Sequence, residues 1–187
     1  EIALAARYFD EETEAKVVIV SGAGRAFSAG ADLKSFGGKQ DKSTHEIAEI
    51  GRRMAESLES MRALAIARIQ GWCVGGGLVL AAACDLRIAS VEAKFSIPEV
   101  DLGIPLAWGG IPRLVRELGP ALTKELVLTC RPFDANEAKA AGFLNRVVPA
   151  DALDAEVDAL AASLAAKAGH ALFSTKRHVN AVTDQMV

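Results

Sequence analysis

Short apolar runs alternate with helix-like segments along most of this 187-residue chain, and this alternation restricts its fold more than any other feature. Residues 16–20 and 63–70 are short runs rich in apolar residues, with the length of buried strands. Between them, residues 44–62 place apolar side chains at steps of three and four, which predicts an amphipathic helix. Because alternating strands and helices are joined by crossover connections, the sequence predicts an α/β fold with a parallel sheet.

The rest of the chain continues the pattern. We expect the end of a helix at 3–9, a polar loop at 35–42, a short helix at 75–83, a strand at 86–89, an irregular segment at 96–108, helices at 110–117, 120–129 and 134–141, a strand at 144–148, and helices at 151–167 and 171–181. Asp151 is the expected N-cap of the helix at 151–167.

The chain opens at Glu1 within a predicted helix. We therefore expect residues 1–150 to form a core that lacks its N-terminal part. Residues 151–187 are expected to begin a C-terminal helical region that continues further.

Composition excludes several classes of protein. The 21 Lys and Arg side chains against 24 Asp and Glu give a formal charge of −3, which provides no basic surface for nucleic acid. No apolar run approaches the roughly 18 residues of a membrane span. The cysteines, Cys73, Cys84 and Cys130, are odd in number and widely spaced, so we expect buried thiols in a reducing compartment, the cytoplasm. His45, His170 and His178 are interpreted as surface residues.

Three consecutive glycines, Gly75 to Gly77, stand between a predicted strand and an apolar helix. The first N–H groups of a helix have no acceptor within it, and glycine allows a ligand to approach the backbone closely. Such a turn can bind a developing negative oxygen, but close packing of helix on sheet explains the glycines equally well. The turn at 21–24 is not a dinucleotide fingerprint, because Phe27 replaces its third glycine.

Four segments form an ordered set of motifs. They are residues 26–34; the triple glycine with its continuation to Ala89; residues 95–99 with 102–104, Gly109-Gly110 and Arg113-Leu114; and residues 138–148. In order and spacing they resemble the signatures of the enoyl-CoA hydratase/isomerase (crotonase) family, over nearly the whole chain.

The resemblance implies a crotonase-like spiral of ββα turns with peripheral helices, assembled as a homotrimer or homohexamer. It implies an oxyanion hole formed by the backbone N–H groups of Ala31 and Gly76, with Glu99 as the catalytic acid–base. The residues implied to bind the CoA thioester are Ala29, Ala31, Asp32, Leu33, Lys34, Gly75 and Gly76. Coenzyme A enters only as part of the acyl-CoA substrate, and no metal or other cofactor is needed.

The sequence departs from the family's hydratases at one position. They carry a glutamate two residues after the triple glycine, where this chain has Val79, whereas the later glutamate is present as Glu99. The apolar residues Phe95, Ile97, Val100 and Leu102 around Glu99 are expected to desolvate its carboxylate and raise its pKa. Leu106 and Trp108 stand where hydratases carry small residues, so the acyl pocket is expected to be reshaped.

A single carboxylate beside an oxyanion hole matches the family's Δ3,Δ2-enoyl-CoA isomerases, and the sequence predicts that activity first. One alternative is a hydratase or hydratase/lyase on an enoyl-CoA, including an aromatic one, because residues 71–73 and 103–105 are similar to the family's hydratase/lyases for aromatic acyl-CoAs. Another is an acyl-CoA-binding protein without catalysis. Trp72 is expected in the core rather than in a pocket for an aromatic acyl group.

Overall fold

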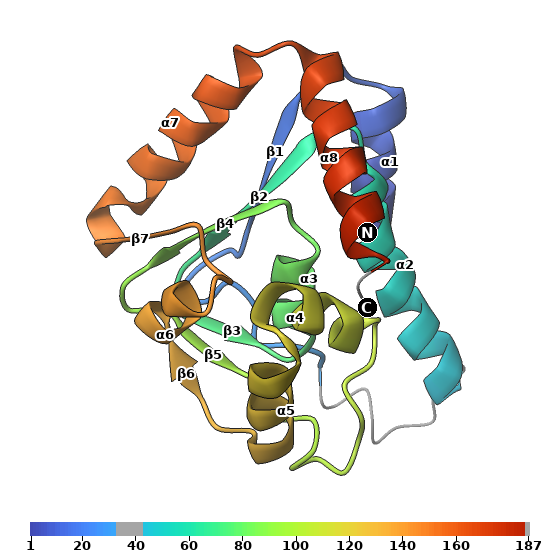
Figure 1. Ribbon diagram of the computed structural model, residues 1–187, viewed down its shortest axis with the longest axis vertical. Helices are drawn as coiled ribbons and strands as arrows, with labels where there is room; N and C mark the ends of the chain where they lie inside the picture. The colour runs from blue at the N-terminus through green and yellow to red at the C-terminus, as the bar shows by residue number, and fades with distance from the viewer. Residues whose placement is uncertain (33–42, 186–187) are drawn as a thin grey trace.

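The computed structural model describes residues 1–32 and 43–185, so the loop predicted at 35–42 lies outside the described residues (Figure 1). Its main sheet has four strands in the order β1-β2-β4-β7. Their bounds are β1 (Val17–Ser21), β2 (Leu64–Ile69), β4 (Leu86–Ser90) and β7 (Arg146–Val148). All three pairings are parallel, which confirms the predicted α/β fold. The most apolar strand, β2, lies between β1 and β4 inside the sheet, and five of its six residues are buried.

A second sheet was not predicted. It contains β3 (Trp72–Val74), β5 (Lys94–Ser96) and β6 (Phe133–Asp134), in that order. The β3–β5 pair is parallel and the β5–β6 pair antiparallel. Strands of two or three residues are too short to show a period-two pattern, so their extended conformation depends on the neighbours with which they pair.

The chain winds through the two sheets in repeated turns. Strands β2 and β3 are followed by helix α3 (Gly76–Ala82), and strands β4 and β5 by helix α4 (Gly110–Leu118). Each turn therefore adds one strand to each sheet and then a helix. The Gly75 N–H donates to the Ser96 carbonyl at 3.0 Å, so the end of β5 is bonded to the start of α3.

The other helices lie around these sheets (Figure 1). They are α1 (Ile2–Glu11), α2 (Thr44–Ser60), α5 (Pro120–Thr129), α6 (Ala135–Ala140), α7 (Leu153–Ala165) and α8 (Gly169–Thr183). The predicted helices are confirmed to within a few residues, but the predicted N-cap of one helix is not. Asp151 lies in a 3₁₀ turn, Ala150–Ala152, and α7 begins only at Leu153 without a side-chain cap. The predicted N-cap role of Asp151 is therefore wrong.

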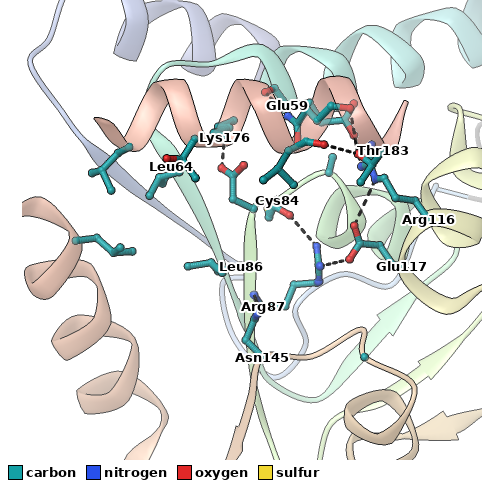
Figure 2. Close-up of a pocket in the computed structure, with 18 residues that line it drawn as sticks. Glu59, Leu64, Cys84, Leu86, Arg87, Arg116, Glu117, Asn145, Lys176 and Thr183 are labelled. Atoms are coloured by element: carbon teal, nitrogen blue, oxygen red, sulfur yellow. Dashed lines mark hydrogen bonds and ion pairs between the residues drawn. The ribbon is translucent and has the colours of Figure 1, made fainter. Parts of the chain in front are cut away.

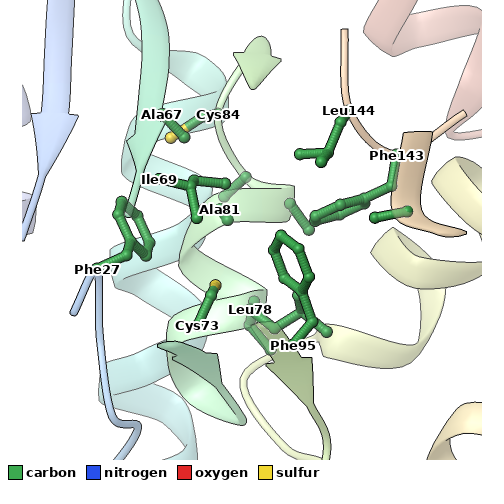
Figure 3. Packing of buried hydrophobic residues seen from close by; sticks show 14 of the residues in the cluster. Phe27, Ala67, Ile69, Cys73, Leu78, Ala81, Cys84, Phe95, Phe143 and Leu144 are labelled. Atoms are coloured by element: carbon green, nitrogen blue, oxygen red, sulfur yellow. The ribbon is translucent and has the colours of Figure 1, made fainter. Parts of the chain in front are cut away.

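Aromatic and small apolar side chains fill the space between the sheets and helices (Figure 3). The Phe95 ring stacks on Phe133 at a centroid distance of 5.2 Å and meets Phe143 edge-on at 6.0 Å. All three cysteines are buried and free, as expected. Trp72 contradicts its prediction, since 47% of the residue is exposed. It lies in β3 on the outer face of the second sheet, paired with the exposed Lys94, whereas the next residue, Cys73, faces the core.

Candidate functional site

The triple glycine forms the start of α3, as the sequence predicts. Gly75 is the N-cap residue with φ 51°, a backbone conformation that favours glycine. Gly76 and Gly77 are the first two residues of the helix and both are buried. The N–H groups of a first helical turn have no acceptor within the helix, so the helix itself leaves these two donors without a partner.

A second backbone segment, residues 28–31, runs beside β3 to the same place. Ser28 forms a parallel bridge with Cys73, and the Val74 N–H donates to the Ser28 carbonyl at 2.9 Å. Gly30 has φ 88°, and a Cβ added there would lie 4.0 Å from the Gly76 nitrogen. The backbone that leads into Ala31 therefore adjoins the start of α3.

Glu99 reaches this place from the turn that follows β5. The turn is held because the Glu99 carbonyl accepts the N–H groups of Leu102 and Ile104 at 3.1 and 3.0 Å. The Glu99 Oε1 atom lies against Gly75, so that a Cβ on this glycine would collide with it. The Oε2 atom is buried and has no hydrogen-bond partner within residues 1–32 and 43–185.

Burial raises the pKa of Glu99 above its ordinary value, because a desolvated carboxyl resists ionisation. This is the expected direction, but only part of the expected cause is present. Phe95 and Ile97 are fully buried, whereas Val100 and Leu102 are 40% and 48% exposed. The chain turns outward after Glu99, so the two later residues contribute to the surface instead of the site.

Apolar side chains occupy the first turn of α3 and its surroundings. Val79 is fully buried, and both its Cγ2 and the Leu106 Cδ2 would lie 2.8 Å from a Cβ added at Gly110. The half-buried indole of Trp108 packs directly on Gly76 and Gly51, since a Cβ on either glycine would overlap the ring. Val79 and Leu106 thus lie together at Gly110, while Trp108 lies against Gly76, the residue that follows the Gly75 contacted by Glu99.

The other candidate residues lie as follows. Ala29 and Asp32 are exposed at the end of the first described segment, whereas Leu33 and Lys34 lie outside the described residues. The three histidines are exposed, as predicted. Within the described residues, no group of three or more His, Cys, Asp or Glu side chains could hold a metal ion. None of the helices described is long and apolar enough to cross a membrane.

Gly51 was not among the site residues predicted from the sequence. It lies in the middle of α2, and its missing Cβ leaves room for the Trp108 ring. A glycine inside a helical pattern costs about 1 kcal/mol relative to alanine and often has a packing reason. That signal, an isolated glycine in an otherwise regular helix, could have identified it.

A cleft of about 480 Å³, lined by both apolar and charged residues, lies elsewhere, and neither Glu99 nor Gly76 lines it (Figure 2). At one side of it Lys176 of α8 donates to Asp85 Oδ2 at 2.9 Å. Asp85 also accepts the Ala65 N–H at 2.7 Å. At the other side Arg87 and Arg116 both bind Glu117. The Lys176–Asp85 pair therefore joins α8 to the core, and the Arg87–Glu117 pair joins β4 to α4.

Comparison with known proteins decides the family. The sequence matches the enoyl-CoA hydratase/isomerase family over residues 1–187. The chain belongs to this family. It is 36% identical over 182 residues to a protein of Mycobacterium bovis named probable enoyl-CoA hydratase, with 96% of this chain and 69% of that protein covered. It is 34% identical over 181 residues to the crotonyl-CoA hydratase of Syntrophomonas wolfei, with 96% and 70% covered.

Solved structures give the same result for the fold. The structure of Pseudomonas aeruginosa DspI superposes with a TM-score of 0.93 at 29% identity, covering 98% of this chain and 70% of that one. An enoyl-CoA hydratase/carnitine racemase of Magnetospirillum magneticum gives 0.91 at 34% identity, covering 100% and 71%. The winding of two strands and a helix described above is therefore the crotonase fold. Enzymes of the enoyl-CoA hydratase/isomerase family act on acyl-CoA thioesters.

Proposed function

We propose that this family member stabilises a thioester enolate and converts 3-enoyl-CoA to 2-enoyl-CoA, with Glu99 as its single acid–base. One observation carries the proposal. The half-buried Glu99, whose buried Oε2 has no hydrogen-bond partner in the described part of the chain, lies against Gly75, next to the first N–H groups of α3. A base with a raised pKa beside two backbone donors is the combination that enolate chemistry requires.

The proposed reaction needs one proton and one carboxylate. Glu99 removes a proton from C2 of the 3-enoyl thioester, and the C–H electron pair moves to the C1–C2 bond while the carbonyl oxygen becomes negative. The N–H groups of Gly76 and Ala31 donate to that oxygen where its charge develops. The protonated Glu99 then delivers the proton to C4, the double bond shifts to C2–C3, and the carboxylate is restored.

Val79 favours isomerisation over hydration. Addition of water in the usual way employs a second carboxylate to activate the water, and the resemblance places that group at position 79. The valine is buried against Leu106 and Gly110, so the side chain at position 79 cannot accept or donate a proton. One carboxylate is sufficient to move a proton from C2 to C4 of the same molecule.

A second candidate is hydration of a 2-enoyl-CoA, because relatives of this chain are named hydratases. It would require another group to activate water. A hydratase/lyase would in addition release an aldehyde from its product. A protein that only binds acyl-CoA would carry out none of these reactions. The products therefore discriminate among all four possibilities.

The same proposal covers the ligand and the assembly. Ala29, Ala31, Asp32, Leu33 and Lys34, together with the triple-glycine turn, would line the path of the CoA thioester, with no cofactor besides the coenzyme A of the substrate. We also propose a homotrimer or homohexamer in the cytoplasm. Ile111 and Leu128 are 41% and 66% exposed, and such apolar surface favours subunit contact. Sedimentation of a stable monomer at micromolar concentration would contradict the assembly.

The decisive experiment follows the α-proton in D₂O. Wild-type protein is incubated with a panel of 3-enoyl- and 2-enoyl-CoA thioesters, and mass spectrometry records deuterium uptake, double-bond position and added water. Glu99→Gln keeps the shape of the side chain and loses only its titratable proton. We expect it to lower exchange and isomerisation by roughly 10²–10⁴, with acyl-CoA affinity changed only a few-fold.

Asp101→Asn is the matched control, because this carboxylate lies two residues from Glu99 and is exposed. It should leave both rates unchanged. Wild-type hydration of 2-enoyl-CoA at ordinary enzymatic rates would refute the single-carboxylate mechanism. Tight binding of acyl-CoA without any exchange would instead identify a binding protein.

A further inference from the structure

Trp108 has an unusual backbone conformation in a position close to the proposed site. Its φ is 60°, a region in which a bulky non-glycine residue is an outlier. Strained residues of this kind persist where the surroundings hold them and they gather at functional sites. The Arg113 guanidinium, itself buried, donates to the Trp108 carbonyl at 3.2 Å and to the Gly109 carbonyl at 2.9 Å. The structure therefore fixes this turn from the helix that follows.

The strained backbone directs the indole onto two glycines. The five-membered part of the ring lies over Gly51 of α2, and the six-membered part lies against Gly76. A side chain at either position would overlap the ring. The indole thus fills the space between the middle of α2 and the first residue of α3.

Glu99 and Trp108 lie against consecutive residues of the same turn. The carboxylate contacts Gly75 and the indole contacts Gly76. A thioester whose carbonyl oxygen accepts the Gly76 N–H would therefore have the carboxylate near its reacting carbon and the indole against the chain beyond it. Leu106 and Val79 close the neighbouring space, as their methyl groups meet near Gly110.

We infer that Trp108 is the specificity-determining residue of this site and restricts it to short acyl-CoA thioesters by closing the acyl pocket against α2. The inference rests on the proposed acyl-CoA site, but it concerns the length of the bound acyl group and not the reaction. A short saturated acyl chain ends at the indole that lies against Gly76. A longer chain requires the ring to leave its two glycines.

Binding of unreactive ligands tests this without catalysis. Calorimetry gives the Kd of butyryl-, hexanoyl-, octanoyl- and decanoyl-CoA for wild type, Trp108→Ala and Trp108→Phe. Wild type should bind butyryl-CoA most tightly. Because each methylene that fits or fails to fit changes discrimination by roughly tenfold or more, Trp108→Ala should shift the octanoyl-to-butyryl affinity ratio by at least about tenfold towards octanoyl-CoA. Trp108→Phe should give a smaller shift in the same direction.

The matched control is Trp72→Ala, the same change at an indole that is 47% exposed. It should leave the chain-length profile unchanged. An unchanged profile in Trp108→Ala, a wild-type preference for long chains, or no binding of any acyl-CoA would each overturn the inference. Missing α-proton exchange with a shifted profile would overturn the proposed reaction alone.

A second measurement leaves Trp108 in place. The sequence contains two tryptophans, so Trp72→Phe makes Trp108 the single reporter of indole fluorescence. Saturation with butyryl-CoA should change its emission, whereas coenzyme A without an acyl group should change it much less. Equal changes with both ligands, or none with butyryl-CoA at saturation, would show that the acyl group does not reach the indole.

Discussion

Replacement of Lys176 by methionine should destabilise the protein more than most single substitutions. The Lys176 ammonium is buried and donates to Asp85 Oδ2 at 2.9 Å and to the carbonyls of Leu58 and Ala63 at 3.0 and 3.1 Å. Only 1% of the lysine side chain and 14% of the aspartate side chain are exposed. Methionine fills the volume but leaves the carboxylate without its cation, a change that costs about 3–5 kcal/mol.

This cost is large against the roughly 5–15 kcal/mol that stabilises a typical protein. It should also depend on pH, because burial already raises the pKa of Asp85 despite the neighbouring lysine. A carboxyl with a raised folded-state pKa contributes stability that is fully present below its unfolded pKa of about 3.9 and is lost as pH rises. Without Lys176 only the Ala65 N–H and the nearby Arg87 still favour the ionised carboxylate. The loss of stability is then larger, so the penalty should be smallest near pH 4 and grow towards neutrality.

Urea unfolding followed by circular dichroism at several pH values measures this penalty. Lys176→Met/Asp85→Asn is the matched control, because the amide still accepts the Ala65 N–H but leaves no buried charge. It should recover about 0.5–3 kcal/mol of the loss at pH 7. A penalty below about 1 kcal/mol, well under the expected range, or one that is equal at pH 4 and pH 7, would refute the reasoning.

Three further predictions concern the proposed site. Glu99→Gln should raise the urea midpoint at pH 7–8, because burial raises the pKa of Glu99 and the ionised form then opposes folding as pH rises. The difference in midpoint between the variant and wild type should vanish below about pH 4. An equal midpoint in the two proteins at pH 7–8 would contradict this. Gly51→Ala should destabilise the fold by about 1–3 kcal/mol, since its Cβ would displace the Trp108 ring; denaturant unfolding with an unchanged midpoint would show that the ring moves freely. Val79→Glu should lower the melting temperature, because it places a charge at a fully buried position. If water enters the site, the added carboxylate should also allow measurable hydration of 2-enoyl-CoA. An unchanged melting temperature would mean that position 79 reaches solvent.

The sequence predicts the main sheet and the helices because their signals are local. Strand β2 is almost entirely apolar and α2 has a regular amphipathic spacing, so each is identified without its neighbours. Strands β3 and β5 have three residues each, and their pairing depends on residues brought together by the fold. Trp72 was misplaced for the same reason, because its exposure follows from the face of β3 that it occupies, opposite the buried Cys73.

The candidate site divides in a similar way. Glu99 and the triple glycine are identified by motif, and their contact in the structure agrees with it. The position of the Trp108 ring could not be predicted, because it depends on a positive φ and on a glycine in α2 that is 57 positions away in the sequence. Lys176 gives no signal either, since lysine in a helix is ordinarily exposed and its partner Asp85 comes from a distant turn.

The winding of two strands and a helix has a consequence for how this chain could change during evolution. The segment that leads into Ala31, the start of α3 and the turn that carries Glu99 lie on three successive turns of the winding, and the hydrogen bond from Gly75 to Ser96 joins the last two. In the proposed reaction, the polarisation of a carbonyl and the transfer of a proton therefore depend on separate stretches of sequence. A substitution on the second stretch can alter the proton chemistry while the donors keep their positions, so new reactions can arise on the same thioester without rebuilding its anchor.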